Sequence, residues 1–185
     1  MGKPRSWVTV KSTYNWKNSI YQQISFNGNN LKKVYSVNWD ETNTANFRKL
    51  VEQGSDDYYK KMFEIPDMRK ISDHKADNVS SVKGALNTKF SYDIAGYLQS
   101  QQQIYLNPIE FQGLLQSPMN EEQRNYPVQY KSLPGIQVTS IMDIPEGYEV
   151  EKLPETLNIA LPDSYGRFTY RAVTTQGKIN LSIRF

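Results

Sequence analysis

The chain has 185 residues, of which 38% are hydrophobic and 12% aromatic, and its formal net charge is +3. This length suffices for one ordinary domain or for two small domains that share a core. Its basic residues are spread along the whole chain, which argues against nucleic-acid binding because phosphate affinity needs clustered cations. The chain contains no cysteine, which excludes disulfides, thiolate metal ligands and a cysteine nucleophile. No apolar run approaches the roughly 20 residues that cross a bilayer.

The two ends of the chain suggest a larger parent protein. The opening residues, MGKPRSW, have no apolar core of the kind found in a secretory signal. The closing residues, GKINLSIRF, alternate like a strand up to the last position. We therefore expect the chain to be a fragment of a longer protein.

A β-hairpin is predicted near the N-terminus. Hydrophobic residues recur at spacing two within 20–26 and precede Asn27-Gly28, a dipeptide typical of tight reversals. They return at the same spacing in 31–39. The alternation in 8–16 predicts another strand before the hairpin.

Two short helices are predicted between residues 43 and 65. The first segment has hydrophobic residues at helical spacing and Gly54 as a stop. The second can be capped by Ser55 and has Asp56 and Asp57 near the positive end of the helix dipole. Its buried stripe is predicted to contain Tyr59, Met62 and Phe63.

Most of the remaining chain is predicted to be strand. Residues 67–81 are polar and favour a loop or a short strand, and 82–94 predict a long strand with Gly84 as a bulge. A connection with several prolines covers 111–127. Further strands are predicted at 101–108, 128–133, 136–145, 148–153, 156–162, 167–174 and 178–185, with turns at 134–135, 145–147, 163–166 and 176–177.

This pattern of short strands and turns is typical of a β-sandwich or of barrel-like antiparallel sheets. We therefore expect a mainly β fold with one or two short helices inserted near residues 43–65. One β-rich unit over 1–185 is the simplest organisation. A sub-boundary near residue 116 would separate the hairpin, helices and long strands (1–116) from an antiparallel β domain (117–185).

The acidic stretch IPEGYEVEKLP, residues 144–154, is predicted to be part of a β-hairpin. Pro145 suits the second position of a type I turn and Gly147 its fourth. In the strand that follows, Glu149 and Glu151 share the parity opposite to Tyr148 and are expected to face solvent.

Several stretches resemble one known family. IPEGYEVEKLPE, followed by NIALPDSYGRFTYRA and GKINLSIRF, resembles the C-terminal β domain of unknown function that follows a transglutaminase-like core in bacterial, mostly Bacteroidetes, multidomain proteins. IYLNPIEFQGLL and SPMNEEQRNYPVQY resemble the same family. The resemblance extends from about residue 103 to the end and is looser before it. Its matching positions upstream are Asn107, Pro108, Arg124, Tyr126 and Pro127.

The resemblance implies a parent protein with a signal sequence, an N-terminal β domain, a papain-like transglutaminase fold with a Cys, His, Asp triad, and then this region. It also implies an exported, periplasmic or cell-surface location. The triad itself cannot be carried onto this chain, which has no cysteine and only one histidine, His74. Members of the family usually continue for some tens of residues past the last strand.

No residue is assigned a catalytic, cofactor-binding or metal-binding role. His74 lies between Asp73 and Asp77, but it has no second imidazole or thiolate and is expected to be solvated. Neighbouring acids point in different directions on a helix or strand, which disfavours paired carboxylate chemistry. These acidic pairs are Asp56 with Asp57, Asp40 with Glu41, and Glu121 with Glu122. Arg124 is interpreted as a structural cation.

Aromatic residues are the one feature with a plausible binding role, although a sheet core explains them more simply. The candidates are Tyr14, Trp16, Tyr97, Tyr105, Tyr126 and Tyr130. Exposed coplanar rings on one sheet face would indicate a carbohydrate-binding or cell-surface adhesion module, with a glycan or protein as partner. A cleft with converging carboxylates or His74 would indicate an independent hydrolase.

With neither feature evident, we expect a non-catalytic β accessory domain. It would give structural support or an interaction surface to a transglutaminase-like or peptidase-like domain upstream in the same exported chain. No cofactor, nucleic acid or membrane span is expected in this region.

Overall fold

The fold is mainly β, as predicted, with two short helices. The computed structural model describes residues 17–40, 44–54, 56–66, 68–81, 83–99, 102–108, 110–111, 135–162 and 166–185. The strand predicted at 8–16, the strand at 128–133 and the boundary near residue 116 lie outside these residues.

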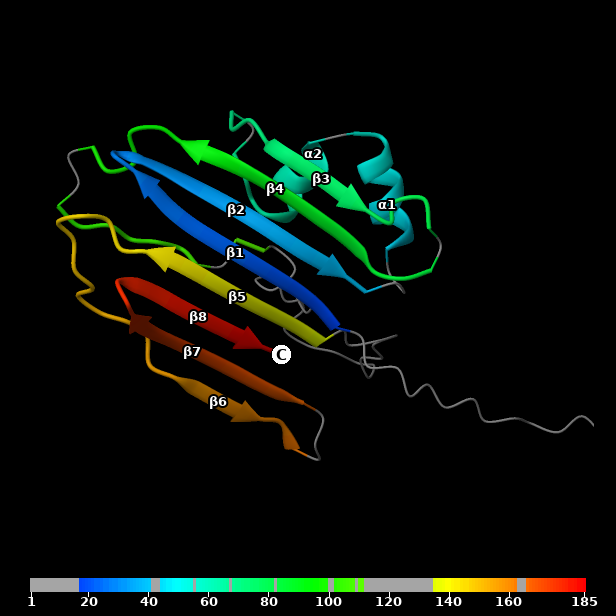
Figure 1. Cartoon of the computed structure of the whole chain (residues 1–185). Helices are drawn as coiled ribbons and strands as arrows, with labels where there is room; N and C mark the ends of the chain where they lie inside the picture. The colour runs from blue at the N-terminus through cyan, green and yellow to red at the C-terminus, as the bar shows by residue number, and fades with distance from the viewer. Residues whose placement is uncertain are drawn as a thin grey trace, which may run out of the picture.

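The described strands form one eight-stranded mixed sheet in the order β3-β4-β2-β1-β5-β8-β7-β6 (Figure 1). All neighbours are antiparallel except β1 and β5, which run parallel. Strands from both sides of residue 116 therefore share one sheet. Their bounds are β1 (Lys17–Asn27), β2 (Asn30–Trp39), β3 (Ser72–Asp77), β4 (Leu86–Ile94), β5 (Gly135–Asp143), β6 (Leu157–Ala160), β7 (Arg167–Thr175) and β8 (Lys178–Arg184).

The predicted N-terminal hairpin is confirmed as β1 and β2. Asn27 pairs with Asn30 at its end, and Gly28 in the turn has a φ of 55°, a left-handed conformation that glycine adopts without steric cost. Ile20 and Ile24 on β1 are buried on the same side as Tyr35 on β2. We call this side of the sheet the inner face and the opposite side the outer face.

Both predicted helices are present and pack on the inner face. α1 (Ala45–Glu52) starts after Thr44, and Gly54 follows it with a φ of 68°. α2 (Asp57–Met62) is followed directly by Phe63. Tyr59 and Phe63 are buried, as predicted, and their rings contact Phe90 of β4 with centroids 4.7 and 5.1 Å apart.

These aromatic contacts explain why no second described sheet covers the first. The helices supply the opposing layer over β2 and β4, where an antiparallel sheet of a sandwich would otherwise lie (Figure 1). The main core is aromatic at this end and aliphatic towards β5 and β8. Its buried members are Ile20, Tyr35, Val37, Trp39, Val51, Tyr59, Phe63, Ile65, Ile71, Leu86, Phe90, Tyr92, Phe111, Val138, Leu181 and Ile183.

Two predicted strands are absent and are corrected here. The described parts of 101–108 and all of 148–153 lie outside the sheet. β5 already has β1 and β8 as neighbours, and β1, β2 and β4 are paired on both sides. The backbone N–H and C=O groups of these strands are therefore already paired, and an alternating segment beside them cannot add to the sheet. Pro154 also lacks the N–H that strand pairing requires.

Two local predictions are also corrected. The turn after β5 begins at Pro145, whose carbonyl accepts the N–H of Tyr148 at 3.1 Å, and Gly147 takes the third position with a φ of 83°. Gly84 precedes β4 rather than bulging within it. The irregularity in this part of the sheet lies in β3, between Ser72 and Lys75.

The last strand, β8, is an interior strand that pairs with β5 on one side and β7 on the other. The N–H of Phe185 donates to the carbonyl of Ile136 at 2.9 Å, so the ladder extends to the final residue. The turn predicted at Gln176-Gly177 joins β7 to β8. Among the described strands, β3 and β6 lie at the edges of the sheet.

Candidate functional site

A cluster of hydrogen-bonded polar side chains lies beneath the inner face and is the strongest candidate for a functional site among the described residues. Lys33 and Tyr35 come from β2 and Tyr92 from β4, all at inward positions of the alternation. Glu110 reaches them from the segment after residue 108. We call these four residues the Glu110 cluster.

The Glu110 carboxylate is shared among three donors. Its Oε1 forms an ion pair with the Lys33 ammonium, and its Oε2 accepts hydrogen bonds from the hydroxyls of Tyr35 at 2.6 Å and Tyr92 at 2.7 Å. The Lys33 side chain is 6% exposed and that of Glu110 19%. Burial of an ion pair is costly unless the charges are matched and hydrogen bonded, and this arrangement meets both conditions.

The polar chain continues across the sheet. Gln22 of β1 donates from Nε2 to the Tyr35 hydroxyl at 3.0 Å, and Ser140 of β5 donates to Gln22 Oε1 at 3.4 Å. Gln22 and Ser140 are both buried. Gln22 and Ser140 therefore connect the Glu110 cluster to both strands of the parallel β1–β5 pair.

The electrostatics favour a structural role for the two tyrosines. Burial raises the pKa of Tyr35 and of Tyr92 far above the usual value near 10, and the nearby Glu110 carboxylate raises both further. Both phenols therefore remain protonated and act as hydrogen-bond donors. A group held in this form is a poor base or nucleophile at neutral pH.

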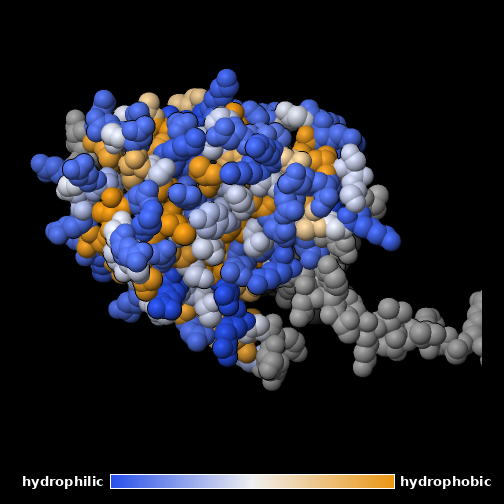
Figure 2. Space-filling view, in the orientation of Figure 1, coloured by the Kyte–Doolittle hydropathy of each residue, from blue (hydrophilic) through white to orange (hydrophobic). Residues whose placement is uncertain are grey.

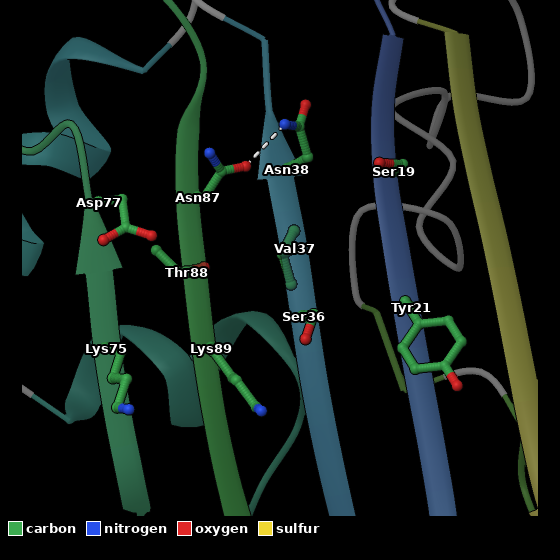
Figure 3. A pocket seen from close by; sticks show the side chains of 10 residues that line it. All are labelled: Ser19, Tyr21, Ser36, Val37, Asn38, Lys75, Asp77, Asn87, Thr88 and Lys89. Atoms are coloured by element: carbon green, nitrogen blue, oxygen red, sulfur yellow. Dashed lines mark hydrogen bonds between the residues drawn. The ribbon is translucent and has the colours of Figure 1, made fainter.

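A shallow hollow of about 380 Å³ lies on the outer face, over β3, β4, β2 and β1 (Figure 3). Asn38 Nδ2 donates to Asn87 Oδ1 at 2.7 Å at one end of the hollow (Figure 3). Asp77 is the one carboxylate among its lining residues, so no acid pair converges there. The lining residues are Ser19, Tyr21, Ser36, Val37, Asn38, Lys75, Asp77, Asn87, Thr88 and Lys89.

A second hollow, of about 650 Å³, lies where the hairpin turns gather at one end of the sheet. It contains part of the acidic stretch, including Pro145, Glu146 and Tyr148. Asp143 in its wall is paired with Lys178 at 2.5 Å. Neither hollow is lined by a member of the Glu110 cluster.

The glutamates of the acidic stretch do not converge. Glu149 and Glu151 are exposed, as predicted, although they lie on an irregular segment rather than a strand. Glu151 Oε2 accepts a hydrogen bond from Gln103 Nε2 at 2.7 Å. Neither Glu149 nor Glu151 lines either described hollow.

His74 lies on edge strand β3. Of the two structures predicted for residues 67–81, a loop or a short strand, the short strand is therefore correct. His74 is exposed, but its Nε2 lies 2.7 Å from the hydroxyl of buried Tyr59. Hydrogen bonding by Ser91 and then the nearby Lys32 ammonium lower the pKa of the adjacent Asp73 carboxyl. Among the described residues no three histidines or acids are grouped as metal ligands.

The aromatic candidates that the structure describes do not gather on one face. Tyr97 lies against Phe26, with ring centroids 6.4 Å apart, and its hydroxyl is 3.4 Å from the Tyr105 carbonyl oxygen. Tyr105 itself is 80% exposed. The other candidates, Tyr14, Trp16, Tyr126 and Tyr130, lie outside the described residues, as does Arg124.

Sequence reasoning missed the Glu110 cluster, although part of its signal was present. Gln22 lies between Ile20 and Ile24 at inward spacing, and Lys33 lies similarly between Leu31 and Tyr35. A polar residue at an inward position predicts a buried partner. The identity of that partner was not readable, because Glu110 follows Lys33 by 77 positions.

One family model matches part of the chain. Residues 102–185 match a domain of unknown function with a solved structure, DUF3858. No curated protein and no solved structure matches the chain closely enough to show a relationship. In the described part of the chain, no helix has the length and apolar character needed to cross a membrane.

Proposed function

We propose that the chain is a non-catalytic β accessory domain of an exported transglutaminase-like or peptidase-like protein of the Bacteroidetes type. In this role it gives structural support or an interaction surface to a catalytic domain upstream in the same protein. The family match and the resemblance of IPEGYEVEKLPE and NIALPDSYGRFTYRA support this context.

The observation that best supports the proposal is the way in which the buried charges are paired. Lys33 and Glu110 neutralise each other and are held by two protonated tyrosines away from both described hollows. Such a cluster fixes a segment in place and leaves no group poised to attack a substrate.

The position of Glu110 supports a role in assembly of the fold. It lies within the matched residues 102–185, whereas Lys33, Tyr35 and Tyr92 precede them. β5 of the matched part also pairs with β1 of the preceding part. The two parts are therefore joined by a backbone ladder and by a buried ion pair, as a rigid support requires.

The parent gene and an activity assay together test the proposal. We expect the reading frame upstream to encode a Cys, His, Asp core preceded by a signal sequence. Purified 1–185 should neither incorporate a fluorescent amine into casein nor cleave a peptide library, whereas the upstream domain should. An activity of 1–185 alone that is lost in Glu110→Gln, or an upstream sequence without such a core, would overturn the proposal.

A further inference from the structure

Within the described part of the chain, the edge strand β6 is paired on one side only. It pairs with β7 through residues Leu157 to Ala160, and no described strand lies on its other side. All four of its residues are exposed. Lys and Asp side chains, which commonly block such an edge, are absent from this strand.

The direction of its backbone groups follows from the antiparallel register. The N–H of Leu161 donates to the carbonyl of Gly166 at 2.9 Å, which places Leu161 in a hydrogen-bonded pair with the β7 side. Such pairs recur at every second residue, so Ile159 and Leu157 also face β7. The N–H and C=O groups of Asn158 and Ala160 therefore point away from the sheet, where an added strand would bind them.

The inner face of this edge is apolar. Leu157 lies opposite Tyr170 and Ile159 opposite Phe168, both on the core side of β7. Leu157 remains 48% exposed and Ile159 51%. An added strand with apolar side chains at its inward positions would cover both.

The outer face of the same region is basic. Arg167 lies opposite Ala160, and Arg171 lies four residues further along β7 on the same face. Arg184 of β8 pairs with Thr169, between them. Figure 2 shows strongly hydrophilic side chains at this lower end of the view, over β7 and β6. None of these arginines forms an ion pair with a described acid.

The basic side chains can reach a strand added beyond β6. Neighbouring strands lie about 4.8 Å apart, so an added strand would lie roughly 10 Å from β7. An extended arginine and an acidic side chain together span about this distance. Ala160 and Asn158 are short and leave the path over β6 open.

We propose that the β6 edge accepts an extended strand from a partner protein, with acidic side chains facing Arg167 and Arg171 and apolar side chains facing Leu157 and Ile159. Backbone pairing would supply affinity and the alternating side chains specificity, as in other cases of β-strand addition. A second copy of the chain fits less well. Antiparallel pairing of two β6 edges would place the arginines of both copies on one surface.

This inference deepens the accessory role proposed above and rests on it for the premise that the chain acts through contact. The two are tested separately. A peptide-binding assay on 1–185 tests strand addition at β6 and needs no upstream domain. The sequence of the parent gene tests the accessory role and does not depend on the β6 edge.

The probe is a synthetic acetylated peptide, VEVEVEV-amide, with KVKVKVK-amide and the scrambled VVEEVVE-amide as controls. Binding is followed by fluorescence anisotropy of labelled peptide and by amide hydrogen exchange of unmodified 1–185. We expect the acidic alternating peptide to bind at least ten-fold more tightly than either control. It should slow exchange at Asn158 and Ala160 and leave the β3 amides unchanged.

Three variants separate backbone pairing from charge. Ala160→Pro removes an outward N–H without touching the β7 ladder and should abolish binding, whereas Ala160→Ser keeps that N–H and a short side chain and should bind like the original chain. The double variant Arg167→Glu, Arg171→Glu should prefer the basic peptide. Circular dichroism and thermal melting verify that each variant folds.

Several results would overturn the proposal. They are equal binding of acidic and basic peptides, full binding by a folded Ala160→Pro, and exchange protection at residues other than those of β6. Protection of Asn158 and Ala160 without peptide, together with a dimer in sedimentation, would assign the edge to a second copy instead. The exchange measurement needs no substitution, so a variant that fails to fold does not prevent the test.

Discussion

The two edges of the sheet are built differently. β3 carries the charged residues Asp73, Lys75 and Asp77, and its register shifts between Ser72 and Lys75. At this irregularity Asp73 has a φ of 53°, and its carboxylate accepts a hydrogen bond from Ser91 of β4 at 2.8 Å. β6 is short and regular, has no charged residue, and exposes Leu157 and Ile159.

The difference shows which end of the sheet is protected. Charges and bulges on an edge strand prevent another strand from pairing with it, and β3 has both. The sheet next to β3 is also covered by α1 and α2, whereas the apolar residues of β6 remain half exposed (Figure 1). The β3 side therefore holds the stable core, and the β6 side holds the available surface.

Matched substitutions in the two halves should give the largest contrast in stability. Phe90 is fully buried against the rings of Tyr35, Tyr59 and Phe63, so Phe90→Ala should lower the free energy of unfolding by about 3–5 kcal/mol. Ile159→Ala should cost less than about 1 kcal/mol because half of the side chain is already in water. Urea denaturation measures both. Equal losses would contradict the division into a core half and an open half.

Loss of the Glu110 carboxylate should have the next largest effect. Glu110→Ala leaves the Lys33 ammonium buried without its partner and should cost about 3 kcal/mol. The double variant Lys33→Met, Glu110→Leu removes both charges and should recover most of that loss. A double variant as unstable as Glu110→Ala would show that packing and the lost hydrogen bonds of Tyr35 and Tyr92, rather than the unpaired Lys33 charge, cause the loss.

The elements that were predicted correctly depend on neighbours in sequence. The hairpin follows from alternation on both sides of Asn27-Gly28, and the helices follow from hydrophobic spacing over 45–62. A few adjacent residues contain this information. The mainly β class follows from the same local signals summed along the chain.

The elements that were missed depend on distant partners. Residues 148–153 alternate like a strand, but alternation does not reveal that β1 and β8 already occupy both sides of β5. The parallel pairing of β1 with β5 joins residues more than a hundred positions apart, such as Ile20 and Val138. The Glu110 cluster was missed for the same reason. Lys33 at an inward position indicates a buried partner but does not identify it.

The buried tyrosines should make the core half sensitive to high pH. An unfolded tyrosine loses its proton near pH 10, whereas in the folded chain the pKa of Tyr59 is raised to about 12 and those of Tyr35 and Tyr92 still further. Above pH 10 the folded state therefore holds more protons than the unfolded state, and stability falls as pH rises.

Between pH 10 and 11 this loss should be about 1 kcal/mol for each of Tyr35 and Tyr92. Denaturation in guanidinium chloride at fixed pH steps measures it. Tyr92→Phe should weaken the pH dependence after its own loss of stability at pH 7 is subtracted. Tyr105→Phe, at an exposed position, is the matched control and should leave the dependence unchanged. A flat profile between pH 9 and 11 would contradict burial of these phenols.

The smallest predicted effect concerns the way β3 is held over the helices. Exposure alone predicts that His74→Ala changes stability by less than about 0.5 kcal/mol, as most surface substitutions do. Its 2.7 Å contact with the Tyr59 hydroxyl raises the expected loss to about 1 kcal/mol, whereas Glu149→Ala should stay within about 0.5 kcal/mol. A double-mutant cycle with Tyr59→Phe isolates the contact. Independent effects of the two substitutions would mean that packing of the buried Tyr59 ring, without its hydroxyl, holds α2 under the protected edge.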